Sequence, residues 1–290
     1  ALYDAIVEGR VAGAGLDVYV TEPCTDSPLF QLDQVVATPH LGASTDEAQE
    51  RAGIAVAVSV RKALAGELVP DAVNVKGGAI HDEIRPSLPL VEKMAQLATA
   101  IAGETPVSME ITVKGDISGH DSSVLAISAL KGALVASGCE DVTYVNAPGL
   151  AAERGVTSNV TTTPDSPEYR SMISLHAALS NGKSIKVDGT LMGIRKVEKI
   201  IAIDNFDLDL PPTDNLLFLR YADKPGVVGA VGNALGNAKI NIAGMQVARE
   251  SAGGSALMAI TVDSPVSDAV AEAVKKETGA ELVRSVTLVN

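Results

Sequence analysis

The sequence has 290 residues, of which 46% are hydrophobic, and this length and apolar content predict more than one folded domain. The net charge of −13 argues against a nucleic-acid partner, because phosphate binding needs clustered lysine and arginine. Cys24 and Cys139 show neither a metal-ligand spacing nor a disulfide framework. No apolar run approaches the ~20 residues that span a bilayer. We expect a soluble, cytoplasmic protein of α/β and α+β domains with no metal site.

The first segment predicts two neighbouring parallel strands with polar residues at their ends. A short helical pattern of apolar residues ends near Gly9 and Gly13, and strands are expected over residues 15–19 and 35–38. Open parallel sheets bind ligands at the carboxyl ends of their strands. Asp17, Glu22 and His40 follow or end these strands, so we expect the three side chains to converge on one crevice.

A histidine beside a carboxylate is a chemically useful pair. His40 could accept the hydroxyl proton of a secondary alcohol, because the ordinary pKa of histidine lies near neutrality. Glu22 could orient the imidazole and stabilise its charged form. In the alternative interpretation His40 is a surface histidine and Glu22 a solvated loop charge, and spacing alone leaves this open.

A long helix and a linker follow this segment. The Ser44–Glu47 stretch has capping and acidic residues typical of a helix start, and the helix is expected to run to Leu64, with its apolar residues used for packing. Residues 70–78 end in a Gly pair and predict a domain boundary. Because the chain opens with Ala1 inside a helical pattern, we expect it to be the C-terminal portion of a larger protein.

The middle of the chain predicts an α+β unit. Alternating apolar residues predict a half-buried strand over 107–115. Helices are expected at 90–101, 122–137 and 147–155, and strands at 171–179, 184–191 and 197–204. A Pro pair at residues 211–212 closes the unit. The scattered His81, His120 and His176 receive no role.

The C-terminal stretch from residue 215 reads strand, helix, strand, strand, helix, strand, which is a ferredoxin-like βαββαβ plan. The turn from Tyr221 to Gly226 opens its first helix, whose N-terminus would favour a carboxylate. Asp223 could bind an ammonium group, and Asn241 offers a donor and an acceptor. This set suits an amino acid. In the alternative, the module only dimerises through its sheet edge.

Two sequence blocks carry a family resemblance. Residues 15–23 (GLDVYVTEP) and 37–45 (ATPHLGAST) closely resemble the signature of D-isomer-specific 2-hydroxyacid dehydrogenases. The resemblance implies that residues 1–57 are the tail of a Rossmann-type NAD-binding domain. It also implies that His40 is the acid/base, that Glu22 is its partner, and that Asp17, His40 and Gly42 contact NAD.

The rest of the chain extends this resemblance. It implies a return segment to a substrate-binding domain at 58–78, an intervening domain at 79–212 and a regulatory domain at 213–290 that resembles an ACT domain. The last would bind L-serine through Tyr221, Asp223 and Asn241. The whole chain is similar to the members of the family that oxidise 3-phosphoglycerate, which implies an NAD-dependent enzyme of L-serine biosynthesis and a homotetramer.

The chain lacks two parts of that machinery. It has no Gly-x-Gly-x-x-Gly between a strand and a helix, and the family's substrate-binding arginine would lie upstream of Ala1. We therefore expect the isolated chain to be inactive. The alternatives are a stand-alone amino-acid-binding regulator and a dehydrogenase of the same family acting on another 2-hydroxy acid.

Overall fold

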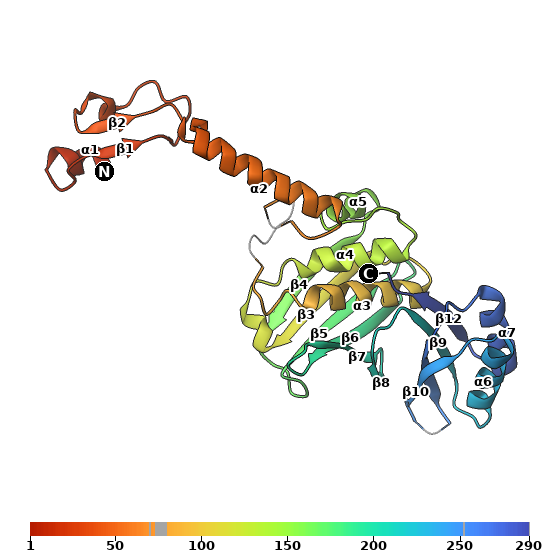
Figure 1. The fold of residues 1–290 in the computed structure, drawn as a ribbon. Helices are drawn as coiled ribbons and strands as arrows, with labels where there is room; N and C mark the ends of the chain where they lie inside the picture. The colour runs from red at the N-terminus through yellow and green to blue at the C-terminus, as the bar shows by residue number, and fades with distance from the viewer. Residues whose placement is uncertain (70, 73–79, 252, 290) are drawn as a thin grey trace. The chain divides into compact units, whose positions relative to one another are not determined.

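The computed structural model describes residues 1–69, 71–72, 80–251 and 253–289 (Figure 1). The chain divides into two compact units, Ala1–Arg61 and Lys62–Asn290. The predicted linker at 70–78 lies almost wholly outside the described residues.

The first unit contains a small parallel sheet and a long helix. In chain order its elements are α1 Leu2–Val7, β1 Ala14–Leu16, the 3-10 helix Pro28–Gln31, β2 Val35–Ala37, the 3-10 helix Gly42–Ser44 and α2 Asp46–Leu64. Leu16 pairs with Ala37 in a parallel register, so the predicted parallel neighbours are confirmed. The predicted strand over 15–19 is too long, because the chain leaves the ladder at Asp17, whose carboxylate turns toward the loop after β2.

This first unit buries little apolar surface. Ala5 and Ile6 are its buried apolar residues. The helix α2 confirms the predicted span, yet none of its residues is buried, and Ile54 and Val56 are about 60% exposed (59% and 61%). Within the described residues, the apolar side chains of α2 therefore do not have the packing role predicted for them.

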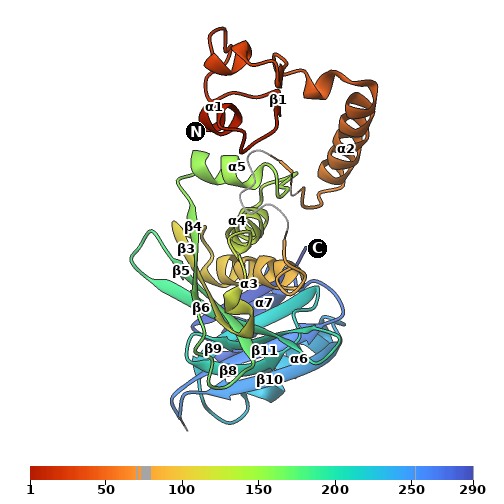
Figure 2. The ribbon, with the colours of Figure 1, turned by 90° about the vertical axis from the view of Figure 1, so that its left-hand side faces the viewer.

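The second unit is built on a six-stranded sheet with strand order β4-β3-β5-β6-β7-β8. Its strands are β3 Ser108–Gly115, β4 Thr157–Thr163, β5 Ser171–Ala178, β6 Ser184–Met192, β7 Val197–Ile203 and β8 Phe206–Leu210. The helices α3 Ser87–Ala102 and α4 Leu125–Ala136 lie on one face of the sheet, and the short α5 Ala147–Glu153 follows α4 (Figure 2).

Both edge strands were missed by the sequence prediction. The β4 sequence, TSNVTTT, has almost no apolar residues, and it is a strand because it pairs in parallel with β3. The β8 residues alternate between buried and exposed positions, and they pair with β7 immediately before Pro211. Partner strands decide both cases, because strand preference depends strongly on context.

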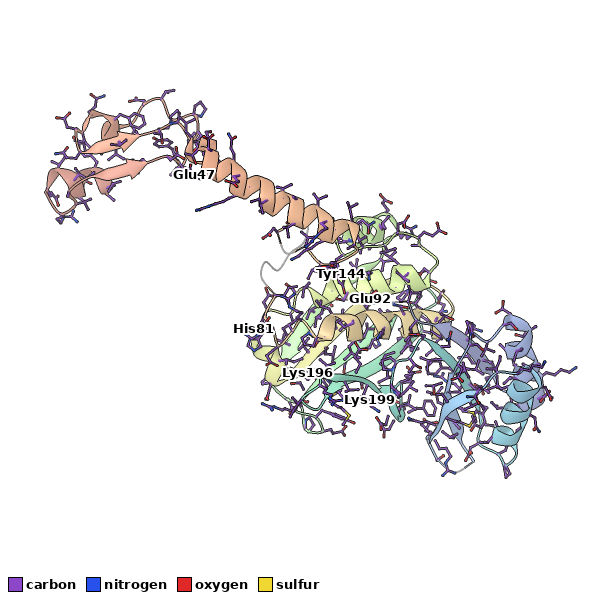
Figure 3. All side chains as sticks on the ribbon, in the orientation of Figure 1. Glu47, His81, Glu92, Tyr144, Lys196 and Lys199 are labelled. Carbon is purple, nitrogen blue, oxygen red and sulfur yellow. The ribbon has the colours of Figure 1, made fainter. Side chains whose placement is uncertain are left out.

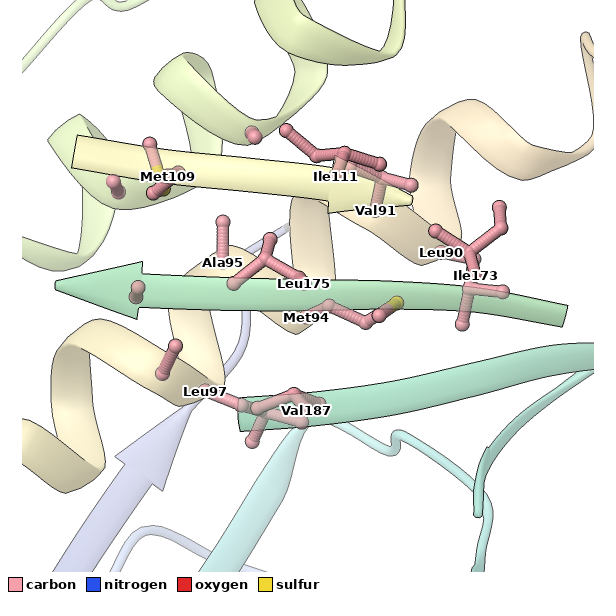
Figure 4. Close-up of a cluster of buried hydrophobic side chains, with 14 of the residues drawn as sticks. Leu90, Val91, Met94, Ala95, Leu97, Met109, Ile111, Ile173, Leu175 and Val187 are labelled. Atoms are coloured by element: carbon pink, nitrogen blue, oxygen red, sulfur yellow. The ribbon is translucent and has the colours of Figure 1, made fainter. Parts of the chain in front are cut away.

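Helix α3 fills the centre of this unit. Its Leu90, Met94 and Leu97 pack against sheet residues that include Leu175 and Val187 (Figure 4). These five side chains are fully buried, and each contributes roughly 1.5–3 kcal/mol to folding by its burial. A Cβ on Gly132 of α4 would lie 2.1 Å from the carbonyl oxygen of Glu92, so glycine permits the close approach of α4 to α3.

One charged cluster is buried between α3, α4 and the segment after α4. Lys131 Nζ lies 2.6 Å from Glu92 Oε1, and the Tyr144 hydroxyl donates to Glu92 Oε2 at 3.1 Å (Figure 3). Burial, followed by the nearby Glu92 carboxylate, raises the pKa of Tyr144 above its usual range. The carboxylate of Glu92 is thus paired with a cation and a hydroxyl, as a buried charge requires.

The C-terminal part of the second unit is the predicted βαββαβ module. Its elements are β9 Asn215–Ala222, α6 Val227–Asn237, β10 Ile242–Arg249, β11 Ser255–Val262, α7 Asp268–Thr278 and β12 Leu282–Thr287, in an antiparallel sheet ordered β10-β11-β9-β12. The predicted fold class, α/β and α+β with several domains, is confirmed.

The two sheets of the second unit share a hydrophobic core. Phe218 and Leu257 belong to the core that contains α3 and α4, whereas Leu217 and Leu219 face α6 and α7. The Gln96 side chain adds two hydrogen bonds across this junction, donating to the Val289 carbonyl at 2.8 Å and accepting from its N–H at 2.9 Å. The C-terminal sheet and α3 are therefore in direct contact.

Candidate functional site

Asp17 organises the loop that follows β2. Its Oδ1 accepts hydrogen bonds from the Leu41 N–H at 2.7 Å and the Thr38 hydroxyl at 2.5 Å, and its Oδ2 accepts from the Gly42 N–H at 2.7 Å. The Thr38 hydroxyl and then the Leu41 N–H lower the pKa of Asp17. A Cβ on Gly42 would lie 2.7 Å from Asp17 Oδ2, so this contact requires glycine.

His40 and Glu22 meet at the same end of the parallel strands. His40 Nδ1 lies 2.7 Å from Glu22 Oε2, and Glu22 Oε1 accepts from the Tyr19 N–H at 2.8 Å. The hydrogen bond that the Glu22 carboxylate accepts from His40 raises the pKa of His40, and the same contact lowers the pKa of Glu22. With Nδ1 held by the carboxylate, Nε2 is the nitrogen that can exchange a proton with a substrate.

The backbone at this pair is held in an uncommon conformation. His40 has a φ of 60°, in the left-handed region that residues other than glycine seldom adopt. The Asp17 hydrogen bonds to the next two N–H groups fix the loop there. The His40 side chain is 59% exposed, so its ring is accessible from solvent.

A second cluster lies at the start of α6. A cavity of about 310 Å³ is lined by Tyr221, Asp223, Gly226 and Arg249 among other residues. Asp223 Oδ2 lies 3.4 Å from an Arg249 nitrogen and accepts from the Gly253 N–H at 3.3 Å. The cavity thus combines a carboxylate, a guanidinium and the N-terminus of an 11-residue helix.

Asn241 is placed apart from this cavity. It lies just before β10 and its side-chain amide donates to Asp263 Oδ2 at 2.8 Å. The structure therefore brings Tyr221 and Asp223 together, and within this chain Asn241 does not line the same cavity.

Three family models match the chain. The model described as "D-isomer specific 2-hydroxyacid dehydrogenase, NAD binding domain" matches residues 1–42. The "D-3-phosphoglycerate dehydrogenase intervening domain" matches residues 83–204, and the ACT domain matches residues 215–279.

Curated proteins are similar to the chain along almost its whole length. D-3-phosphoglycerate dehydrogenase of Mycobacterium leprae is 46% identical over 289 residues, which cover 99% of this chain and 54% of that protein. The proteins of the same name from Synechocystis and Bacillus subtilis are 34% and 33% identical, over 96% and 100% of this chain and 50% and 55% of theirs. The chain is a relative of D-3-phosphoglycerate dehydrogenases. It spans about half the length of the curated relatives that it matches.

The similarity to D-3-phosphoglycerate dehydrogenases includes both residue clusters. The segment matched by the NAD-binding model contains Asp17, Glu22 and His40, and the segment matched by the ACT model contains Tyr221 and Asp223. The predicted boundaries at 57/58 and 212/213 remain predictions, and the one at 78/79 lies outside the described residues.

Three further residues of these clusters were not singled out from sequence. The Tyr19 hydroxyl donates to the Thr38 carbonyl at 3.0 Å, and its ring packs edge-on against Phe30. Tyr19 and Thr38 stand inside the two sequence blocks, which was the available signal. Arg249 carried no local signal, because only the pairing of β10 with β11 and of β11 with β9 brings it near Asp223.

No group of three or more His, Cys, Asp and Glu residues suited to a metal ion occurs in the described part of the chain. Among the same residues, no helix is both long and apolar enough to cross a membrane.

Proposed function

We propose that the whole protein oxidises 3-phospho-D-glycerate to 3-phosphohydroxypyruvate with NAD, the first step of phosphorylated L-serine biosynthesis. The observation that carries this proposal is the 2.7 Å contact of His40 Nδ1 with Glu22, next to a loop fixed by Asp17. This arrangement leaves one imidazole nitrogen available for the substrate hydroxyl. The similarity to D-3-phosphoglycerate dehydrogenases supports the choice of substrate.

In this mechanism His40 transfers one proton and Glu22 assists it. The neutral His40 Nε2 accepts the proton of the substrate hydroxyl, and Glu22 stabilises the imidazolium that forms. Tyr19 holds Glu22 in place through its N–H. The same groups return the proton in the reverse direction. NAD, when bound, accepts the hydride from the carbon that carries the hydroxyl.

The residues present fit the nicotinamide end of NAD. Asp17 Oδ2 accepts one hydrogen bond within the chain, from Gly42, so a carboxylate oxygen with spare acceptor capacity faces this region. Gly42 and His40 complete the candidate contacts. The sequence has no glycine-rich phosphate loop, so the pyrophosphate contacts would come from residues outside this chain.

The test is NAD-dependent oxidation of 3-phosphoglycerate by the whole protein, followed through the absorbance of NADH. His40→Asn should lower kcat about 100- to 10,000-fold, because general-base catalysis contributes about that much. Glu22→Gln should lower kcat less. His176→Asn is the matched control, since that histidine is exposed on β5 outside the site. A His40→Asn protein with undiminished kcat would remove His40 from the role of the base, and absence of NADH formation by the unsubstituted whole protein would remove this function.

We also propose that the cavity at α6 binds L-serine as a feedback effector. Asp223 would bind the ammonium group, and the N-terminus of α6 would bind the carboxylate. Titration calorimetry of L-serine into the chain should give saturable heat that Asp223→Asn abolishes, and Asn241→Ala tests the predicted third contact. Absence of heat with the unsubstituted chain would leave this module with an assembly role.

Assembly and location belong to the same proposal. The protein is proposed to be a cytoplasmic homotetramer, in which the intervening domain couples the effector cavity to the dehydrogenase site. Light scattering of the whole protein tests the oligomeric state directly.

A further inference from the structure

A large cavity lies at one end of the six-stranded sheet, and none of its lining residues belongs to either cluster above. Its volume is about 700 Å³, within the range of small-molecule sites. Four stretches contribute to it: the first turn of α3 with Glu83 before it, the segment that follows β3, the start of β5, and the end of β6 with the turn to β7. It lies wholly within the second unit.

Two ion pairs stand at this cavity. Lys196 Nζ lies 2.9 Å from Glu83 Oε2, and Arg170 Nε lies 2.5 Å from Asp116 Oδ2. All four side chains are exposed, at 41% or more. Exposed ion pairs contribute little to stability, so a ligand can exchange places with either partner at low cost.

The interior of the cavity is apolar with one unused hydroxyl. Met172 and Leu191 line it and are only half-buried, so they present apolar surface to the cavity. Ser87 also lines it, at 0% exposure, and its Oγ has no hydrogen-bond partner in the described part of the chain. A buried hydroxyl without a partner lowers stability, and a bound polar group would recover part of this cost.

A pair of stacked histidines forms part of the wall. The His120 ring lines the cavity and stacks on the His81 ring at 3.7 Å between centroids and 13° between planes. His81 Nδ1 accepts from the Glu83 N–H at 3.2 Å, which ties this wall to the ion pair with Lys196 (Figure 3).

The charges decide the class of ligand. The two cations, Lys196 and Arg170, are each already paired with a carboxylate. A simple anion that bound either cation would therefore deprive that carboxylate of its partner. A zwitterion instead replaces one ion pair with two, because its carboxylate binds the cation and its ammonium binds the carboxylate. The apolar interior then accommodates a hydrocarbon side chain.

We infer that this cavity binds an amino acid with an apolar side chain, which inserts between Lys196 and Glu83 and places its side chain against Met172 and Leu191. The carboxylate of the ligand pairs with Lys196 and accepts from the Ser87 hydroxyl. Its ammonium group pairs with Glu83. The site is separate from the cavity at α6 and does not depend on the proposed dehydrogenase activity.

The experiment is titration calorimetry of L-leucine into the full chain, with two analogues that each keep one charge. These are 4-methylpentanoate, which lacks the ammonium group, and 3-methylbutylamine, which lacks the carboxylate. L-Leucine should bind saturably and at least about tenfold more tightly than either analogue. Equal binding of 4-methylpentanoate would overturn the inference in favour of a simple anion site, and absence of saturable heat with L-leucine would overturn it altogether.

Substitutions locate the binding. Lys196→Met and Glu83→Gln should each weaken L-leucine binding at least about tenfold, whereas Lys199→Met should not. Lys199 is the matched control because it lies on the same strand β7 and pairs with Asp209 at 2.8 Å, outside this cavity. Asp223→Asn should leave L-leucine binding intact. Retained binding in both Lys196→Met and Glu83→Gln would contradict the assignment, and circular dichroism checks that each variant is folded.

Ser87→Ala provides a second, independent variant. Removal of an unpartnered hydroxyl should not lower the melting temperature, yet it should weaken L-leucine binding several-fold. Unchanged binding in this variant would remove Ser87 from the site and contradict the orientation proposed for the ligand carboxylate.

Discussion

Different interactions stabilise the inside of the segment Ala1–Arg61 and the inside of the segment Lys62–Asn290. In the first, Asp17 and Glu22 accept hydrogen bonds from loop N–H groups, and almost no side chain is buried. In the second, two helices cover a sheet with a continuous apolar core that extends into the C-terminal module. Hydrogen bonds therefore position the candidate catalytic groups in the first segment. The buried apolar core of the second segment provides the stability of the chain.

Charged pairs give the largest expected contrast. Lys131→Met should lower the free energy of unfolding by about 3–5 kcal/mol, because it leaves the buried Glu92 without its cation. Arg10→Met is the matched change in the first segment, where the pair with Glu8 is more than half exposed, and it should cost less than about 1 kcal/mol. Urea unfolding measures both. Similar losses in the two variants would contradict the comparison.

Apolar side chains give the next contrast. Ile111→Ala in β3 should cost about 2–5 kcal/mol, since this side chain is fully buried. Ile54→Ala in α2 makes the same chemical change at a position that is 59% exposed. It should leave stability within about 0.5 kcal/mol of the unsubstituted chain. A large loss for Ile54→Ala would mean that α2 is packed in solution.

The junction inside the second segment is expected to show a smaller effect. Gln96→Met keeps the side-chain volume but removes both hydrogen bonds to Val289, at a cost of about 1–3 kcal/mol. Gln246→Met is the control, because Gln246 makes a similar pair of hydrogen bonds with the Asp209 backbone in an exposed setting. Water can replace the hydrogen bonds of Gln246, so the melting temperature should change less in Gln246→Met than in Gln96→Met. Equal changes in melting temperature for the two variants would mean that burial does not strengthen the Gln96 hydrogen bonds.

The smallest effect on stability, and the most specific test, concerns the pKa of His40 in the first segment. Glu22→Gln should lower the pKa of His40 toward its ordinary value of 6.5, because the carboxylate favours the charged imidazole. NMR of the histidine Cε1 protons measures this shift. An unchanged His40 curve would mean that the pair does not form in solution.

The same pair sets a pH window for its own contribution to stability. Because the pKa of folded His40 is raised, its contribution is present below the unfolded pKa and is lost as the pH rises through the folded value. Because the pKa of folded Glu22 is lowered, its contribution is lost as the pH falls through that lowered value. The pair therefore contributes most between the unfolded pKa values of Glu22 and His40, and less as the pH moves beyond them toward either folded value.

The sequence by itself determined the order of elements in the C-terminal module, the long helix α2, and the convergence of Asp17, Glu22 and His40. The order of elements and the helix follow from local periodicity. The convergence follows from the rule that neighbouring parallel strands end at one edge of a sheet, which brings together residues 18 positions apart such as Glu22 and His40. The roles of these residues remain predictions.

Only the tertiary structure decided the edge strands β4 and β8, the exposure of α2, and the meeting of Arg249 with Asp223. The strands exist because neighbouring strands pair with them, and periodicity does not reveal a partner. The apolar pattern of α2 predicts an apolar face but not whether another element covers it. The cavity at Lys196 and Glu83 joins residues 113 positions apart, a proximity that only the packing of α3 against the sheet creates.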